Sequence, residues 1–218
     1  MSAKAKSDVY HMIGCMSGTS LDGIDLAFVR FTETDGWTFK VLASKTVVYN
    51  KGWKRKLRKA IQLTPTKLQK LDVEYTDFLG AAIVEFIDKE KIELLDAVAS
   101  HGHTVFHQPD KGLTLQIGNL SHLADRIGWP VICDFRTQDV ALGGQGAPLV
   151  PMGDLMLFKN HRACVNLGGF SNISIFQNQS VLAYDICAVN TVLNFLARRL
   201  DLPYDEGGKI AASGKIIA

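Results

Sequence analysis

Apolar residues run through the first fifty positions in strand-length stretches. Residues 10–15, 24–31 and 39–48 are rich in β-branched and aromatic side chains and are separated by small and polar residues. This pattern predicts three strands, the last two joined through the turn at Asp35 and Gly36. Two consecutive hairpins indicate that the sheet starts with antiparallel strands.

Helical spacing replaces the strand pattern after residue 50. Trp53, Leu57 and Ile61 recur every four residues, which predicts a helix over residues 53–62. Thr64 and Pro65 then have the residue types of a helix cap and a first helical position. Apolar side chains at helical spacing continue from there, so a long helix is predicted to about residue 89.

Strands and helices alternate through the rest of the chain. Strands are predicted at residues 96–100, 113–117 and 130–133, on both sides of Gly168 and Gly169, and at 181–185. Helices are predicted at 121–127 with Asn119 as the cap, at 148–158 and at 190–200. This order is typical of an α/β domain in which parallel strands are added to the antiparallel ones. We therefore expect a mixed sheet flanked by helices.

Composition adds limits to this picture. The 218 residues are 47% hydrophobic and 21% charged with a formal net charge of +2, which gives no reason to expect nucleic acid or a membrane as partner. The basic run at 54–59 is expected to be the solvated face of its helix rather than a binding patch. The four cysteines form no Cys-x-x-Cys pair, and the N-terminus has no apolar signal core. A cytoplasmic protein with buried free thiols is the expectation.

The first predicted turn carries candidate phosphate chemistry. Gly18 and Gly23, between two apolar strands, allow positive φ and close backbone approach, and Thr19 and Ser20 bring hydroxyl groups. Successive amides in such a turn form a concave site for anions. Phosphate binding between two strands is therefore the first functional hypothesis.

Two carboxylates, Asp22 and Asp25, extend that hypothesis, because they could hold a magnesium ion through its waters. The stretch is not a Walker motif, since no Gly-Lys-Ser/Thr follows. It is not a dinucleotide fingerprint either, since a strand follows rather than a helix. A plain hairpin remains the competing interpretation of this stretch taken alone.

Two further stretches place polar groups after predicted strands. His101, His103 and His107 have no carboxylate or cysteine nearby to complete a metal site, so the polar lining of a cleft is favoured over a metal. Residues 134–148 carry two carboxylates, one arginine and three glycines. They follow a strand at the position where open α/β sheets bind ligands, although a solvated glycine-rich connector explains them equally well.

The opening hairpin has a counterpart about 150 residues later, where Gly168 and Gly169 again separate two apolar strands. Two such hairpins, each opening a lobe, could grip a phosphate chain from both sides. The pair favours phosphate chemistry more strongly than either hairpin alone.

Four strings in order resemble the anhydro-N-acetylmuramic acid kinase family, within the superfamily of sugar kinases, actin and the large chaperone ATPases. They are residues 16–23 (MSGTSLDG), 100–104 (SHGHT), 135–149 (FRTQDVALGGQGAPL) and 166–173 (NLGGFSNI). The resemblance runs from Ile13 to about Gly214. It implies an actin-like ATPase (ribonuclease H-like) α/β fold, with a first lobe over residues 1–160. The second lobe, over 161–218, would be incomplete, because the family's chains are much longer.

The resemblance also implies an activity. The family opens the 1,6-anhydro bridge of its sugar with water and transfers the γ-phosphate of ATP to the sugar O6. The product, N-acetylmuramic acid 6-phosphate, returns a cell-wall fragment to metabolism. ATP and Mg²⁺ would be the cofactors, the amino sugar the substrate, and a homodimer the expected assembly.

Roles for individual residues follow from the same resemblance. Asp139 would be the general base that deprotonates the attacking water. His103, Arg136 and Gln145 would face the substrate cleft. The residues implied in binding the phosphates of ATP are Gly18, Thr19, Ser20, Leu21, Asp22, Gly23, Ile24, Asp25, Gly168 and Gly169. Asp22 would also hold the magnesium ion through water.

One stretch departs from the family pattern. Ile186 to Asn190 stand where the family has a Thr-Gly-Pro-Gly-like stretch. The sequence therefore leaves open whether Asp185 and its loop contact the nucleotide. Two other functions stay open as well. One is a non-catalytic sugar-binding remnant of such a kinase, and the other is an actin-like ATPase module without a sugar acceptor.

Overall fold

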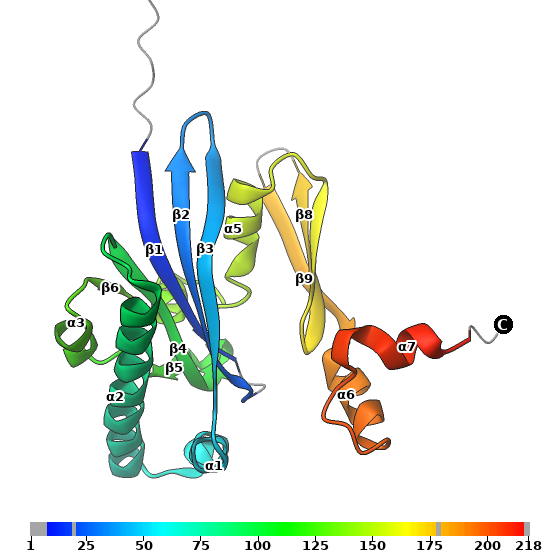
Figure 1. The fold of residues 1–218 in the computed structure, drawn as a ribbon, viewed down its shortest axis with the longest axis horizontal. Helices are drawn as coiled ribbons and strands as arrows, with labels where there is room; N and C mark the ends of the chain where they lie inside the picture. The colour runs from blue at the N-terminus through cyan, green and yellow to red at the C-terminus, as the bar shows by residue number, and fades with distance from the viewer. Residues whose placement is uncertain (1–7, 19–20, 178–179, 216–218) are drawn as a thin grey trace, which may run out of the picture. The chain divides into compact units, whose positions relative to one another are not determined.

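The computed structural model describes residues 8–18, 21–177 and 180–215 (Figure 1). Thr19 and Ser20, both proposed to bind phosphate, lie outside the described residues. The chain divides into two compact units, Met1–Leu149 and Val150–Ala218. The resemblance implied a boundary between the two lobes after residue 160, whereas the two units meet after Leu149.

A mixed sheet forms the centre of the first unit. Its strands are β1 (Asp8–Ser17), β2 (Gly23–Glu33), β3 (Trp37–Val48), β4 (Ala97–Gln108), β5 (Leu113–Ile117) and β6 (Val131–Ile132). The predicted antiparallel start is confirmed, because β1 pairs with β2 and β2 with β3 in antiparallel register. β4 runs parallel to β1 and β6 runs parallel to β4, while β5 pairs antiparallel with the second half of β4. The order is β3-β2-β1-β4-β5, with β6 also on β4.

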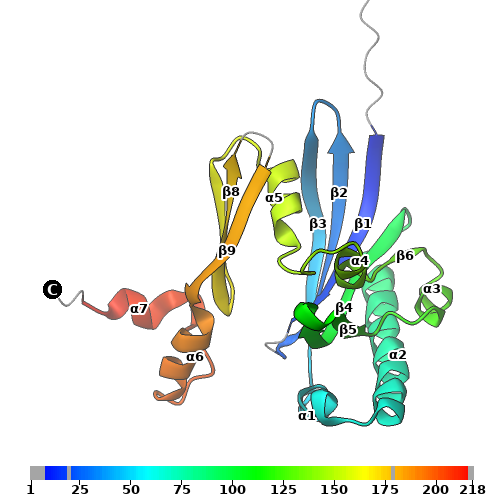
Figure 2. The same ribbon diagram turned by 180° about the vertical axis from the view of Figure 1, so that it is seen from behind.

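Helices connect and flank this sheet. They are α1 (Lys51–Lys59), the 3₁₀ turn η1 (Ala60–Gln62), α2 (Pro65–Glu90), the 3₁₀ turn η2 (Pro109–Lys111), α3 (His122–Ile127) and α4 (Phe135–Ala141). α2 begins at Pro65 as predicted, but Thr64 makes no side-chain capping bond. α1 is capped by Asn50, whose Oδ1 accepts the amide of Trp53 at 2.9 Å. α2 lies in front of the sheet in Figure 1, and α4 comes to the front in Figure 2.

The core lies between α2 and the sheet. Tyr75, Leu79, Ile83 and Phe86 recur at helical spacing on one face of α2, and each is at most 1% exposed. They join a cluster that includes Ile13 of β1 and other buried strand residues. Burial of each large apolar side chain contributes about 1.5–3 kcal/mol, so this contact is the main source of stability in the unit.

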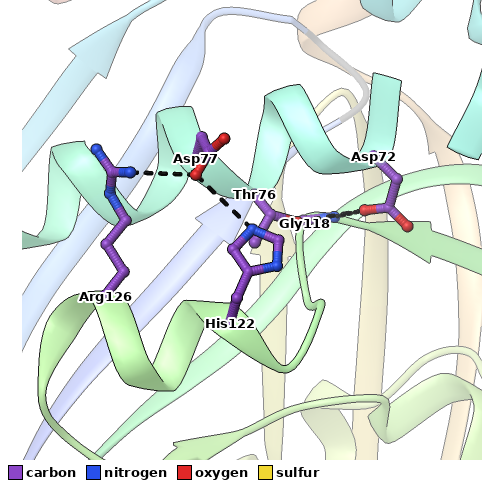
Figure 3. Close-up of polar contacts among 6 residues, drawn as sticks. All are labelled: Asp72, Thr76, Asp77, Gly118, His122 and Arg126. Carbon is purple, nitrogen blue, oxygen red and sulfur yellow. Dashed lines mark hydrogen bonds and ion pairs between the residues drawn. The ribbon is translucent and has the colours of Figure 1, made fainter. Parts of the chain in front are cut away.

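Polar contacts attach α3 and the end of β5 to α2 (Figure 3). The carboxylate of Asp77 accepts a hydrogen bond from Arg126 Nη1 at 3.1 Å and lies 3.7 Å from His122 Nε2. Asp72 Oδ1 accepts the amide of Gly118 at 2.7 Å. Burial raises the pKa of Asp72, and the bond from Gly118 partly offsets that rise. These contacts fix the segment that follows β5 against the helix.

Three local predictions were wrong in this unit. The strand predicted to end at residue 100 continues through the histidines as part of β4. Gly102 has a φ of +70° at the point where the register between β4 and β1 shifts, a conformation that glycine adopts without strain. Asn119 does not cap a helix, because its Oδ1 accepts the hydroxyl of Ser100 at 2.7 Å. The segment interpreted as a glycine-rich loop begins with the helix α4.

The second unit contains its own antiparallel sheet. Its elements are α5 (Val150–Leu157), β7 (Ala163–Leu167), β8 (Phe170–Gln177), β9 (Ser180–Ala188), α6 (Asn190–Arg198), the 3₁₀ turn η3 (Glu206–Gly208) and α7 (Lys209–Ser213). The strand order is β7-β8-β9, as the sequence predicts for two successive hairpins. α5 is joined to this sheet by the hydroxyl of Ser174, which donates to Asp154 Oδ2 at 2.8 Å. Within the described residues, no helix of either unit has the length and apolar character needed to cross a membrane.

Candidate active site

The candidate residues of the first unit gather at one edge of its sheet. β1, β4 and β6 are parallel, so the segments that follow β1 and β6 leave the sheet at the same edge. β1 ends at Ser17, which is in register with His103 of β4, and β6 leads through Asp134 into α4. Open α/β sheets bind their ligands at the carboxyl ends of parallel strands.

The turn between β1 and β2 is shaped by close packing. A Cβ on Gly23 would lie 2.4 Å from the carbonyl oxygen of Val47, so only glycine fits there. The positive φ in the described part of this turn belongs to Leu21, at +59°. The side chains of Leu21 and Ile24 are buried in the core. The Leu21 amide donates to the carbonyl of Gly18 at 3.3 Å, and Ile24 lies in β2, paired with both β1 and β3. The carboxylate of Asp22 is exposed.

Asp25 and Cys15 lie on the strands beside that turn. Asp25 is exposed, and its Oδ1 accepts the hydroxyl of Thr46 at 2.6 Å. Burial, and secondarily the charge of Asp25, raise the pKa of the Cys15 thiol to about 12. Cys15 is therefore a protonated core residue rather than a nucleophile.

A chain of buried polar groups supports the end of β1. Ser17 Oγ lies 2.7 Å from the hydroxyl of Tyr49 and 3.0 Å from Nδ1 of His103. The Tyr49 hydroxyl in turn contacts that of Tyr75 at 2.5 Å. His103 is only 4% exposed, so its ring supports Ser17 from within the core. Burial, followed by the neighbouring His101, lowers the pKa of His103 to about 4 and keeps the ring neutral.

The glycine-rich segment after α4 encloses the carboxylate of Asp139. The Gly146 amide donates to Asp139 Oδ2 at 2.7 Å, and the Gly144 amide donates to the Asp139 carbonyl at 2.8 Å. A Cβ on Gly144 would lie 2.2 Å from Oδ2, so the loop must have no side chain there. Gly143 and Gly146 have φ of +90° and +69°, which glycine adopts without strain. Gln145, between them, is exposed.

Arg136 lies one helical turn before Asp139 and contacts the same loop. Its Nε donates to His101 Nε2 at 2.8 Å, and its Nη1 donates to the Gly146 carbonyl. His101 Nδ1 lies 2.9 Å from the Gly102 carbonyl. A guanidinium only donates and a carbonyl only accepts, so the two contacts require the neutral tautomer with its proton on Nδ1. Burial is the largest cause that lowers the pKa of His101, and it lowers that of Arg136 as well.

The sequence pattern did not assign roles to Ser17, Tyr49 or Tyr75, and it gave His101 only the role of a polar residue that lines a cleft. The first three are single hydroxyl groups within apolar stretches, where only the fold shows that they meet. His101 was part of a recognised string, and its contact with Arg136 spans 35 positions of sequence.

The glycine turn of the second unit is tied to the start of α6. The carbonyl of Gly168 accepts the amide of Asn190, and the carbonyl of Gly169 accepts the amides of Val189 and Thr191. The Thr191 hydroxyl also donates to Gly169 at 3.0 Å. Val189 and Asn190 belong to the stretch that departs from the family pattern. Their backbone amides thus connect that stretch to the Gly168–Gly169 turn, which matches the pattern.

The donor set suits magnesium better than a transition metal. Asp22 and Asp25 present exposed carboxylates beside the first turn, and hydrated Mg²⁺ needs only one or two such oxygens. Among the residues that the structure describes, no group of three histidine, cysteine or acidic side chains is arranged to hold a metal ion.

The first unit has the fold of the sugar kinase and actin-like ATPase class. An antiparallel β1–β2–β3 sheet is followed by α2, by β4 parallel to β1, and by β6 parallel to β4. A model of the family described as anhydro-N-acetylmuramic acid kinase matches residues 10–218. The chain belongs to this family.

Curated relatives carry the same name. The anhydro-N-acetylmuramic acid kinase of Bacillus thuringiensis (strain Al Hakam) is 37% identical over an alignment of 230 positions, which covers 96% of this chain and 59% of the relative. Those of Bacillus cereus (strain 03BB102) and Bacillus anthracis (strain A0248) are each 37% identical over an alignment of 228 positions, which covers 95% of this chain and, again, 59% of the relative. The chain thus spans about three fifths of the length of these relatives.

Proposed function

We propose that this protein is an ATP-dependent kinase that opens 1,6-anhydro-N-acetylmuramic acid with water and phosphorylates O6, giving N-acetylmuramic acid 6-phosphate. The observation that carries the proposal is the carboxylate of Asp139, held by the Gly146 amide in the segment that follows the parallel strand β6. Family membership supports the same reaction.

Asp139 acts as the general base. The Gly146 amide engages Oδ2, so Oδ1 is the oxygen that takes the proton of the attacking water. The water oxygen bonds to C1 and the bond from C1 to O6 breaks. The released O6 then bonds to the γ-phosphorus of ATP, while the bond from that phosphorus to the bridging oxygen breaks and ADP leaves. General-base catalysis of this kind contributes about 10²–10⁴-fold to a rate.

The turns position the phosphates. In the first unit, Gly18 and residues 21–25 are the candidates that we propose for contacts with the phosphates of ATP. Gly168 and Gly169 are candidates of the same kind within the second unit. Bound Mg²⁺ would neutralise charge on the transferring phosphoryl group, and the exposed carboxylates of Asp22 and Asp25 would hold it through water. His103 supports the first turn through its contact with Ser17. Gln145, an exposed residue of the glycine-rich loop, binds the sugar.

The chemistry suits a cytoplasmic enzyme of cell-wall sugar recycling. The four cysteines are free thiols, which suits a reducing compartment. Cys15 is buried as expected, whereas Cys133 and Cys164 are partly exposed and Cys187 is exposed, so the prediction of burial was wrong for these three.

Release of ADP tests the proposal. The 218-residue chain is incubated with Mg-ATP, with and without 1,6-anhydro-N-acetylmuramic acid, next to Asp139→Asn. We expect sugar-dependent turnover that falls at least about 10²-fold in the variant, because the amide cannot accept the proton. Near-normal turnover in Asp139→Asn would remove Asp139 from this role.

The same assay separates the two other functions. Sugar binding without ADP release favours a non-catalytic sugar-binding remnant. ADP release that does not depend on the sugar favours an actin-like ATPase module.

A further inference from the structure

One buried residue, Tyr49, contacts both ends of the first turn. Its main-chain amide donates to the carbonyl of Asp22 at 3.1 Å, and its hydroxyl lies 2.7 Å from Oγ of Ser17. Ser17 is the last residue of β1, and Asp22 directly precedes β2. Tyr49 therefore ties the point where the chain leaves the sheet to the point where it returns.

The backbone of the turn needs such support. A hydrogen bond within it, from the Leu21 amide to the Gly18 carbonyl, is 3.3 Å long. Leu21 has a φ of +59°, a left-handed conformation that is unfavourable for a residue other than glycine. Such a conformation persists only where the surrounding structure enforces it. The contacts of Tyr49 supply that constraint at the ends of the turn, beside the buried side chain of Leu21.

Tyr49 is itself fixed in place. It follows β3 directly and precedes Asn50, whose side chain caps α1 (Figure 1). The Tyr49 ring is 2% exposed and packs with the rings of Tyr75 and Phe78, at centroid distances of 6.4 and 6.1 Å. Because close packing and the bond to the Tyr75 hydroxyl restrain the ring, its own hydroxyl has a defined position.

The hydroxyl of Tyr49 stays neutral in the folded protein. Burial is the largest cause that raises its pKa, so the group keeps its proton and both donates and accepts hydrogen bonds. Ser17 Oγ also lies 3.0 Å from Nδ1 of His103. Tyr49 and His103 together fix the side chain of Ser17, and with it the end of β1.

Position decides whether such a turn can work on phosphates. Phosphoryl transfer is accelerated mainly by positioning and by electrostatic stabilisation, for which the binding groups need a fixed geometry before the ligand arrives. Since the Tyr49 side chain is buried, its effect on a ligand passes through the turn rather than through direct contact.

We propose that Tyr49 is a positioning residue for the nucleotide, because it ties Ser17 to Asp22 and so holds the first turn in the conformation that binds the phosphates of ATP. This inference rests on the proposed function, since it takes ATP as the ligand of the turn.

Calorimetry with Mg²⁺ and a non-hydrolysable ATP analogue tests the inference without the need for turnover. Tyr49→Phe keeps the ring and the amide and removes only the hydroxyl contacts with Ser17 and Tyr75. The affinity of the 218-residue chain for the analogue should fall about three- to tenfold, the scale of one hydrogen bond. The affinity for 1,6-anhydro-N-acetylmuramic acid should stay unchanged, because the altered group lies beneath the phosphate turn.

A matched control separates positioning from a loss of stability. Ile83→Val removes one methylene group from a fully buried position of α2 and destabilises the same core by an amount comparable with the loss of a hydroxyl contact. This variant should bind the analogue as tightly as the unaltered chain.

Ser17→Ala tests the route from the hydroxyl to the turn. Both changes break the contact between Tyr49 and Ser17, so their effects should not add. The double variant should bind the analogue no more weakly than the weaker-binding single variant.

Three results would overturn the inference and leave the kinase proposal standing. They are an unchanged affinity for the analogue in Tyr49→Phe, an equal loss in Ile83→Val or in sugar affinity, and losses that add in the double variant.

Failure of the unaltered chain to bind the nucleotide would count against the proposed function, and hydrogen exchange then decides whether Tyr49 holds the turn. Exchange of the Leu21 amide, followed by NMR, should be at least about tenfold faster in Tyr49→Phe than in the unaltered chain or in Ile83→Val. Equal exchange rates in the three proteins would overturn the inference.

Discussion

At the scale of single residues, the candidate base is held by main-chain groups rather than by other side chains. The amide of Gly146 binds the Asp139 carboxylate, and the absence of a Cβ at Gly144 makes room for it. The glycines of this loop therefore determine the direction in which the carboxylate points. A change in the loop should act on catalysis without touching a charged residue.

Gly144→Ala tests this dependence. The new Cβ would lie 2.2 Å from Oδ2 in the present geometry, so the carboxylate or the loop has to move. We expect sugar-dependent ADP release to fall on the order of 10²-fold, as small displacements of a catalytic group do. Gly153→Ala is the control, because no atom lies within 4 Å of the Cβ it adds. Equal rates in the two variants would show that the loop does not position Asp139.

The buried hydroxyl of Tyr49 belongs to the same scale. It contacts both Ser17 and Tyr75, so Tyr49→Phe leaves two buried hydroxyl groups with one partner fewer. The free energy of unfolding, measured in urea, should fall by about 1–3 kcal/mol. Tyr10→Phe, at a position that is 38% exposed, should change it by less than about 0.5 kcal/mol. A similar change in both variants would contradict the role given to the buried hydroxyl.

At the scale of elements, α2 stabilises the first unit by burying one face on the sheet. Leu79→Ala removes a side chain that is 1% exposed and should lower the free energy of unfolding by about 2–5 kcal/mol. Leu94→Ala removes the same atoms at a position that is 61% exposed and should have little effect. An equal loss of unfolding free energy in both variants would mean that the contact between α2 and the sheet is not the dominant one.

The elements also show which structure the sequence encodes locally. The strands at the start of the first sheet and the start of α2 at Pro65 could be predicted from the sequence. The apolar pattern of a strand and the preference of proline for the first helical position both depend on only a few neighbouring residues. The extension of β4 could not, since the conformation of Gly102 depends on β5 packing beside it. α4 was missed because its seven residues precede a glycine-rich stretch that dominated the pattern. The pairing of His101 with Arg136 depends on that tertiary arrangement as well.

At the scale of the whole molecule, the two units differ in how much core each contains. The buried hydrophobic cluster is formed by residues of the first unit, whereas Ala197 is the buried hydrophobic residue found among the described positions of the second. A chain of residues 1–149 should therefore unfold cooperatively on heating, with little binding of the dye ANS. Strong dye binding without a cooperative transition would show that this unit depends on the rest of the chain.

The stability of the molecule should also depend on pH through His103. Its pKa is lowered from 6.5 to about 4, so the unfolded chain binds a proton between these values and the folded chain does not. The free energy of unfolding should fall as the pH drops through this range, with a slope from this group of up to about 1.4 kcal/mol per pH unit. His103→Gln should make the measured slope shallower, and His161→Gln, at an exposed position, should not. Identical slopes in all three proteins would contradict a neutral buried ring.

The buried thiol of Cys15 has a practical consequence. Because burial keeps it protonated with a raised pKa, maleimide dyes that attack thiolates will spare it in the folded protein. Cys187 is exposed on β9, and its backbone is bonded to Ser171, two residues beyond Gly169. A fluorophore placed there would report on the second glycine turn during nucleotide titrations while the core stays unlabelled.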